Sequence, residues 1–246
     1  MPPLVEFHRL DKSFFGVHAL RDVSFAVAAG EIHALVGANG AGKSTLMKTL
    51  VGIHAPDAGE IRLDGRAIRP AGPEEARRLG IDIVFQEIEL PLNLTIAECV
   101  FLGREPTRWG LVDYRRMHEE TAALLRRLGL QRSPIAAVAN LSVAEKQLVQ
   151  VARALQGETR LLIMDEPTSA LTDHESERLF GILERLRAGG TAILYVSHKL
   201  EEVFRLADRV TVLRDGAVIA TRPRADLTRD ELVALMLGQS RPRAAE

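Results

Sequence analysis

The sequence has little cysteine, few aromatic residues and almost no net charge. Its single cysteine, Cys99, cannot form an internal disulfide, which fits a reducing compartment. The 32 basic and 33 acidic residues leave a net charge of -1, which argues against a nucleic acid partner. No apolar run approaches the ~20 residues of a membrane-spanning helix. The first residues include acids and lack a long apolar core, so no signal peptide is predicted.

Short apolar runs alternate with turn signals and helical patterns along the 246 residues, of which 46% are hydrophobic. This composition supports a sizeable core, and strands separated by helices predict an α/β fold with a mostly parallel sheet. The predicted strands cover residues 4–10, 23–27, 32–36, 60–63, 81–85, 161–164, 191–196, 209–213 and 217–221. The predicted helices cover residues 44–51, 114–128, 142–155, 175–187, 200–206 and 228–237.

The same pattern predicts that residues 1–246 form one domain. Strand signals fade after about Pro91, where apolar residues recur at helical spacing. The expected parts are an α/β core of residues 1–90 and 156–222, a helical subdomain of residues 91–155, and a C-terminal helix with a polar tail, residues 223–246.

A glycine-rich segment follows the near-continuous apolar run at residues 32–36 and matches the pattern GxxxxGK[ST]. Glycines let the backbone curl so that successive N–H groups point at phosphate oxygens, and the following helix adds its positive end. Lys43 would neutralise the β- and γ-phosphates, and the Ser44 hydroxyl would bind Mg²⁺. The predicted nucleotide site comprises Gly37, Ala38, Asn39, Gly40, Ala41, Gly42, Lys43, Ser44 and Thr45.

Two carboxylates, Asp165 and Glu166, directly follow the apolar run at residues 161–164. The carboxyl ends of strands form the edge at which open α/β sheets bind ligands. Asp165 suits the Mg²⁺ shell, through water, and Glu166 suits polarising an attacking water. The Asn-Lys-x-Asp base reader of GTPases does not occur in the sequence.

An ordered set of motifs resembles the ATP-binding subunit of ATP-binding-cassette (ABC) transporters along nearly the whole chain. The resemblance implies a P-loop NTPase cassette with a mixed, mostly parallel core sheet, an N-terminal antiparallel β portion and an inserted helical subdomain. It also implies ATP hydrolysis with Mg²⁺. The matching positions are residues 37–45, Gln86, residues 141–145, Asp165 with Glu166, residues 169–171 and His198.

The resemblance assigns roles to three further side chains. Gln86 resembles the glutamine that senses Mg²⁺ and the attacking water, at a hinge toward the helical part. His198 resembles the switch histidine that contacts the γ-phosphate. Phe14 occupies the place of an aromatic residue that stacks on adenine, with Phe15 as an alternative and core packing as the competing interpretation for both.

Residues 142–145 align with the ABC signature, which in the family reaches the γ-phosphate held by the opposite subunit. Ser142 and Glu145 also form a capping-box pair that would start a helix. Val143 and Ala144 replace the two signature glycines, and Glu145 replaces its glutamine. The added Cβ atoms and the carboxylate would disfavour a close approach to phosphate, so this half of the site departs from the family pattern.

The residues at these motifs are similar to those in the first cassette of monosaccharide importers of the ribose, galactose, xylose and fructose type. In most of that group two cassettes share one chain, and both a single-cassette member and part of a longer chain are consistent with this sequence. The resemblance implies transmembrane permease subunits, a second ABC cassette and, indirectly, an extracytoplasmic sugar-binding protein as partners. It implies a cytoplasmic location, peripheral on the inner face of the cell membrane.

Two other functions fit a chain with these motifs. One is a soluble ABC ATPase acting in translation or DNA repair, although such proteins usually have two cassettes or a coiled-coil insertion. The other is a regulatory cassette that binds ATP without hydrolysing it, which the altered signature favours and the presence of Glu166 and His198 disfavours.

Overall fold

The computed structural model describes residues 3–86 and 90–238, and its main feature is a six-stranded sheet in the order β12-β11-β3-β10-β9-β6. Neighbouring strands pair in parallel except β11 and β12, which the Asp215-Gly216 turn joins as an antiparallel hairpin. The strands are β3 (Ile32–Val36), β6 (Ile81–Val84), β9 (Leu161–Asp165), β10 (Ala192–Val196), β11 (Arg209–Arg214) and β12 (Ala217–Pro223).

A second sheet of four antiparallel strands has the order β2-β1-β4-β5. Its strands are β1 (Pro3–Phe14), β2 (Val17–Ala28), β4 (Ala58–Leu63) and β5 (Arg66–Ile68). This antiparallel part and the mostly parallel main sheet confirm the predicted fold class. The first two strands are longer than predicted. Arg9 and Asp22 have positive φ angles of 45° and 47°, and the pairing of the two strands shifts register nearby. These bulges interrupt the apolar alternation that reveals a strand in the sequence.

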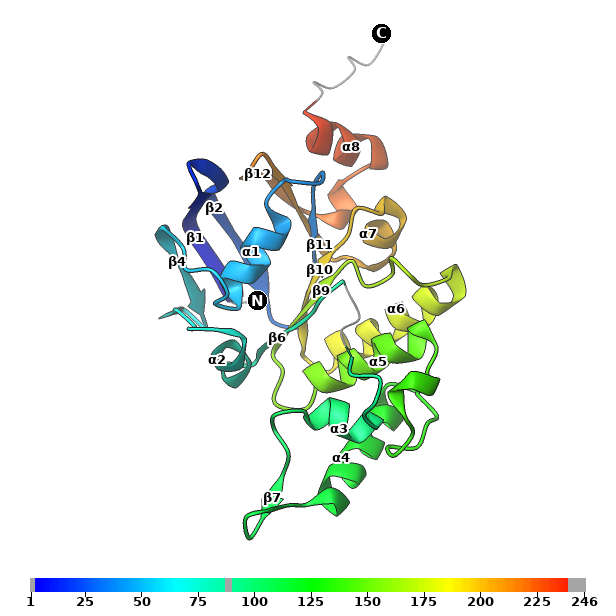
Figure 1. Ribbon diagram of the computed structural model, residues 1–246. Coiled ribbons are helices and arrows are strands. Elements are labelled where there is room, and N and C mark those ends of the chain that lie inside the picture. The colour runs from blue at the N-terminus through cyan, green and yellow to red at the C-terminus, as the bar shows by residue number, and fades with distance from the viewer. Residues whose placement is uncertain (1–2, 87–89, 239–246) are drawn as a thin grey trace.

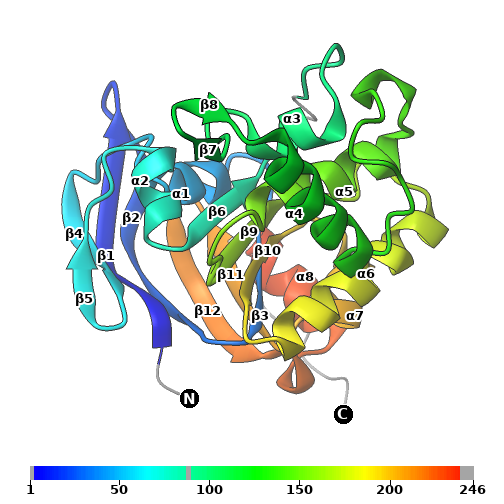
Figure 2. The same ribbon diagram turned by 90° about the horizontal axis from the view of Figure 1, so that it is seen from below.

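Helices cover both faces of the main sheet. The helices are α1 (Lys43–Leu50), α2 (Pro73–Arg78), α3 (Ile96–Phe101), α4 (Tyr114–Arg127), α5 (Val143–Ala154), α6 (Asp173–Ala188), α7 (Leu200–Leu206) and α8 (Arg229–Leu237). Figure 1 shows α3, α4 and α5 gathered at one end of the molecule and α8 at the other. Figure 2 shows the antiparallel sheet on one side of the main sheet and α3 to α6 on the opposite side.

Apolar side chains alternate between the two faces of the main strands. Leu35 of β3 joins the core that lies between the two sheets, which also contains Leu46 and Leu50 of α1. Tyr195 of β10 and Met164 of β9 face the opposite way, into the core formed with α3 to α6. A smaller cluster packs α7 and α8 against β3 and β11. Because both faces are covered, these strands read as continuous apolar runs.

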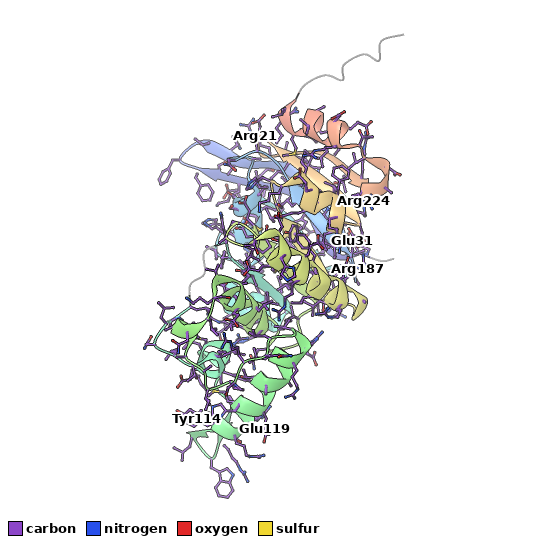
Figure 3. All side chains as sticks on the ribbon, turned by 90° about the vertical axis from the view of Figure 1, so that its right-hand side faces the viewer. Arg21, Glu31, Tyr114, Glu119, Arg187 and Arg224 are labelled. Atoms are coloured by element: carbon purple, nitrogen blue, oxygen red, sulfur yellow. The ribbon has the colours of Figure 1, made fainter. Side chains whose placement is uncertain are left out.

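The described part of residues 91–155 contains α3, α4, α5 and a hairpin that the helical spacing did not reveal. Strands β7 (Thr107–Arg108) and β8 (Leu111–Val112) form this hairpin. Helix α3 also escaped prediction because it has six residues, too few to show a period. Its start has a capping box, in which Thr95 accepts a hydrogen bond from the Glu98 amide. Figure 3 shows Tyr114 and Glu119 of α4 at the end of the molecule remote from Arg21 and Arg224.

Most predicted elements agree with the structure to within a few residues. The capping box predicted at Ser142 with Glu145 forms, and Thr228 with Glu231 forms another at the start of the predicted last helix. The predicted polar tail, residues 239–246, lies outside the described residues. Across residues 3–86 and 90–238, none of the helices combines the length and the apolar composition needed to span a membrane.

Candidate functional site

The parallel strands deliver the predicted site residues to one edge of the main sheet. Register pairs Val196 of β10 with both Leu35 of β3 and Asp165 of β9, so these strands end together. The glycine-rich loop follows β3 and Glu166 follows β9. Gln86 and His198 stand two positions after the ends of β6 and β10. Carboxyl ends of parallel strands are where such sheets bind ligands.

A pocket of about 590 Å³ lies at this edge. It brings together residues that are up to 179 positions apart in the chain, from Ala19 to His198. The lining residues are Ala19, Asn39, Gly40, Ala41, Gly42, Lys43, Ser44, Thr45, Gln86, Asp165, Glu166 and His198. The structure thus places most of the predicted nucleotide-binding, metal-binding and catalytic side chains in a single cavity.

The glycine-rich loop is held closely against β2 and β11. A Cβ atom at Gly37 would lie 2.2 Å from the Leu213 carbonyl oxygen, and one at Gly42 would lie 2.5 Å from the Ala19 carbonyl oxygen. Gly42 also has a φ of 103° and immediately precedes α1. Glycine is therefore required at both places, by backbone contact at Gly37 and by contact and conformation at Gly42.

Lys43 is buried inside the loop. Its ammonium Nζ donates hydrogen bonds to the carbonyl oxygens of Gly37 at 2.8 Å and Ala38 at 3.1 Å. Burial lowers the pKa of Lys43, although the nearby carboxylates of Glu166 and Asp165 act in the opposite direction. Gly37 and Ala38 are not lining residues of the pocket, but their carbonyls position this cation.

Asp165 and Glu166 carry two adjacent carboxylates at the end of β9. Burial, followed by repulsion from Glu166, raises the pKa of Asp165 to about 6, while Lys43 and Lys48 partly offset the shift. The Glu166 carboxylate Oε1 lies 3.0 Å from the His198 Nδ1. Glu166 has a positive φ of 45°, and its amide donates to the Val196 carbonyl oxygen at 2.9 Å. A strained backbone thus orients the carboxylate toward His198.

The donor set around the pocket fits Mg²⁺. The Ser44 hydroxyl, the Gln86 amide and the Asp165 carboxylate share the cavity, and oxygen ligands of this kind suit a hard cation. A nearby cation would also stabilise the Asp165 anion, which burial disfavours. Mg²⁺ is usually held by one or two carboxylates together with substrate phosphates, which agrees with the small number of side chains here.

The signature positions lie apart from this pocket. Ser142 is the exposed N-cap of α5, and its hydroxyl oxygen accepts a hydrogen bond from the Glu145 amide. Residues Ser142, Ala144 and Glu145 line a separate cavity of about 330 Å³, and the Val143 side chain is 44% exposed. A site that combines the glycine-rich loop with this segment therefore needs another molecule to supply one of the two halves.

Arg132 neutralises the unusual carboxylate of the signature segment. Its Nε and Nη2 atoms donate to the two oxygens of Glu145 at 2.7 Å and 3.2 Å. The same carboxylate accepts from the Ser142 amide at 2.9 Å. The guanidinium and the capping bonds lower the pKa of Glu145. The sequence reveals the capping pair but not Arg132, because the ion pair joins positions 13 residues apart.

Phe14 lies outside the lining of the nucleotide pocket. Its ring packs edge-on against His54 with 4.9 Å between ring centroids, and Lys12 Nζ lies 5.3 Å from its centroid. Phe15 is fully exposed in the turn after β1. Both residues are close in sequence to Ala19, whose carbonyl contacts the glycine-rich loop and which the sequence interpretation did not include.

Comparison with known proteins identifies the family. A family model described as ABC transporter matches residues 20–169. The chain belongs to the ABC transporter family. Among solved structures, an ATP-binding subunit of an ABC transporter is 30% identical, with a TM-score of 0.77 over 95% of this chain and 99% of that chain. CbiO1 from Clostridium perfringens, part of an ABC transporter complex, is 25% identical with a TM-score of 0.82, covering 99% of this chain and 97% of that one.

Curated relatives of this ABC family member are longer. A ribose import ATP-binding protein of Streptomyces avermitilis is 49% identical over 96% of this chain and 47% of its own length. A putative ribose/galactose/methyl galactoside import ATP-binding protein of Burkholderia lata is 48% identical over 97% of this chain and 47% of its own length. The chain spans about half the length of these relatives.

Replacing Gly42 by alanine should destabilise the protein more than replacing Gly40. Both glycines have positive φ angles, which cost a larger residue roughly 1–2 kcal/mol. Only the Gly42 Cβ would meet backbone, whereas nothing lies within 4 Å of a Cβ at Gly40. Urea unfolding should show at least about 1 kcal/mol of additional loss for Gly42→Ala. Equal losses would contradict the close approach of the loop to Ala19.

Replacing Asp165 by asparagine should stabilise the Mg²⁺-free protein above pH 6. The native pKa of about 6 lies above the ordinary value of 3.8, so folding favours the protonated carboxyl. Stability is therefore lost as the pH rises from about 4 to 6, and asparagine removes that loss. A shift of two pKa units corresponds to about 3 kcal/mol, which partial exposure reduces to roughly 1–2 kcal/mol.

Urea midpoints measured in EDTA at pH 4 and pH 8 test this pH dependence. The two proteins should differ more at pH 8 than at pH 4. A difference that is larger at pH 4 would contradict the burial of the Asp165 carboxylate.

Proposed function

We propose that this chain is the ATP-binding and ATP-hydrolysing part of a transporter. The observation that carries the proposal is the pocket in which Lys43, Asp165, Glu166 and His198 meet at one edge of the sheet. The glycine-rich loop supplies backbone N–H groups and a buried ammonium, which suit the phosphates of ATP. The adjacent carboxylates suit the chemistry at the terminal phosphate.

The side chains of the pocket divide the work of hydrolysis. Lys43 would exchange its bonds with the Gly37 and Ala38 carbonyls for the β- and γ-phosphate oxygens. Glu166 would hold the attacking water and accept its proton, and His198 would donate a hydrogen bond to the γ-phosphate. The Glu166 carboxylate and the His198 ring lie 3.0 Å apart, on the same side of the pocket.

Ser44, Gln86 and Asp165 are the residues that would hold Mg²⁺, with Asp165 acting through water. The ion would draw charge from the phosphate oxygens and so favour phosphoryl transfer. Asp165 suits this site, because its half-buried carboxylate would be stabilised as an anion by a cation in addition to Lys43. For adenine, Phe14 remains the proposed stacking side chain.

A second cassette would complete the active site. Ser142 stands at the N-terminus of the 12-residue α5, which favours an anion, but it does not line the pocket of its own chain. The γ-phosphate held by one cassette would therefore meet Ser142, Val143, Ala144 and Glu145 of the other. The Arg132 ion pair supports this role, because it reduces the repulsion between the Glu145 carboxylate and a triphosphate.

The transported molecule is proposed to be a monosaccharide. The support is the identity of 48–50% to proteins named as ribose or ribose/galactose import ATP-binding proteins. Permease subunits in the membrane and an external sugar-binding protein would complete the transporter, with this chain on the cytoplasmic face. A groove of about 610 Å³ beside Gln86, lined also by Phe85 and Arg153, is the proposed path of coupling to the permease.

The proposed division of the chain assigns different tasks to its parts. The core, residues 1–90 and 156–222, would bind and hydrolyse ATP, and residues 91–155 would present the signature and face the permease. The support is that α3, α4 and α5 contact one another, while Gln86 lies along the chain between β6 of the main sheet and α3.

Replacing Glu166 by glutamine should abolish turnover and preserve binding of Mg-ATP. Loss of a general base costs about 100-fold or more in rate, whereas the loop and Lys43 are unchanged. Phosphate release should be measured on the chain alone and on the complex recovered with it from membranes. Glu158→Gln is the matched control, since Glu158 is exposed and outside the pocket.

Three other results would argue against parts of the proposal. Unchanged turnover in Glu166→Gln would contradict the assigned role. Binding of Mg-ATP without turnover by the wild-type complex would identify a regulatory cassette. Recovery of ribosomes or DNA in place of membrane proteins would identify a soluble ABC ATPase.

A further inference from the structure

A buried carboxylate, Glu202 of α7, lies beneath the catalytic edge of the sheet. Only 7% of the residue is exposed, and it does not line the nucleotide pocket. Its Oε1 accepts a hydrogen bond from the Thr168 hydroxyl at 2.5 Å. Its Oε2 accepts from the Tyr195 hydroxyl at 2.8 Å and the Ser197 hydroxyl at 2.9 Å. Lys199 Nζ lies 3.3 Å from Oε1.

The partners of Glu202 flank both residues that face the terminal phosphate. Thr168 follows Glu166 by two positions, and Ser197 and Lys199 stand on either side of His198. The Lys199 amide also donates to the Ser197 hydroxyl oxygen at 3.0 Å. One carboxylate therefore joins the segment after β9 to the segment after β10.

The hydrogen-bonding chemistry of this network favours a carboxylate. The three hydroxyl groups each donate to it, the Lys199 ammonium can only donate, and an ionised carboxylate only accepts. Thr168, Tyr195 and Ser197 are each at most 2% exposed, so water cannot replace a lost partner. An amide in place of the carboxylate would turn one acceptor oxygen into an N–H donor, so either Thr168 with Lys199 or Tyr195 with Ser197 would lose its acceptor. An unmatched buried polar group is costly.

The backbone at Glu166, two residues before Thr168, is strained, and the network would help to hold it in place. Glu166 has a φ of 45°, a conformation that persists only where the surroundings hold it. Its amide bond to Val196 fixes one side, and the bond from Thr168 to Glu202 fixes the chain just beyond. The orientation of the Glu166 carboxylate against His198 thus depends on both attachments.

We infer that Glu202 is a positioning residue, which keeps Glu166 and His198 in register for hydrolysis without touching ATP. The inference rests on the proposed function of the pocket. It adds a residue that acts through Thr168 and Ser197. Binding of ATP depends on residues 37–45, so Glu202 should affect the rate of hydrolysis and leave affinity unchanged.

The test compares Glu202→Gln with Glu201→Gln. Glu201 is the adjacent residue on α7, but it is exposed and pairs with Arg229 at the surface. Misplacement of a catalytic group costs up to ~100-fold, so Glu202→Gln should lower kcat about tenfold or more with KM for Mg-ATP within about twofold. Glu201→Gln should leave both unchanged. An unchanged kcat, or a change confined to KM, would overturn the inference.

Tyr195→Phe provides a second variant that removes one donor and keeps the carboxylate. It should fold like the wild type and lower kcat by about threefold, with KM again unchanged. A wild-type kcat in this variant, together with an unfolded Glu202→Gln, would indicate a structural role only and overturn the inference.

Amide hydrogen exchange separates this inference from the proposed function. In folded Glu202→Gln the amides of Glu166 and Lys199 should exchange about tenfold faster or more, because their segments lose a shared anchor. Absence of hydrolysis in the wild-type complex would refute the proposed function alone. Unchanged exchange at both amides would refute the positioning role whether or not the wild type hydrolyses ATP.

Discussion

Four strands, β3, β10, β9 and β6, run parallel and end at one edge because their backbone hydrogen bonds hold them in register. This pairing brings together groups that are distant in sequence: the glycine-rich loop, Glu166, His198 and Gln86. Continuous apolar runs specify the strands, since the sheet is covered on both faces. Side chains at the ends of such covered strands are held more precisely than side chains on loops.

The chemistry of the edge then follows from close approach and charge. Gly37 and Gly42 allow the loop to lie against the carbonyls of Leu213 and Ala19. Lys43 and the two carboxylates at the end of β9 are held together, and the pKa of Asp165 is raised as a result. A cation would stabilise the Asp165 anion and phosphate oxygens would pair with the buried Lys43 ammonium, so the folded protein is arranged in advance for a charged ligand.

Features encoded by neighbouring residues could be predicted from the sequence. The main strands, the loop, the carboxylates at the end of β9 and the capping box at Ser142 all depend on local patterns. The short helices α2 and α3 and the β7–β8 hairpin are too small to show a period. The contacts that join the site across the chain also escaped prediction: Glu166 with His198, Arg132 with Glu145, and Glu202 with Thr168. Such pairs depend on the topology of the sheet and on helix packing, which no local pattern encodes.

The central claim is that the loop at residues 37–45 binds the phosphates of ATP together with Mg²⁺. Titration calorimetry of the purified chain with Mg-ATP tests it most directly. Saturable binding is expected for the wild type, and Lys43→Ala should weaken it at least about tenfold, because a buried charge-assisted contact is lost. A flat titration, or equal affinities for the two proteins, would contradict the account.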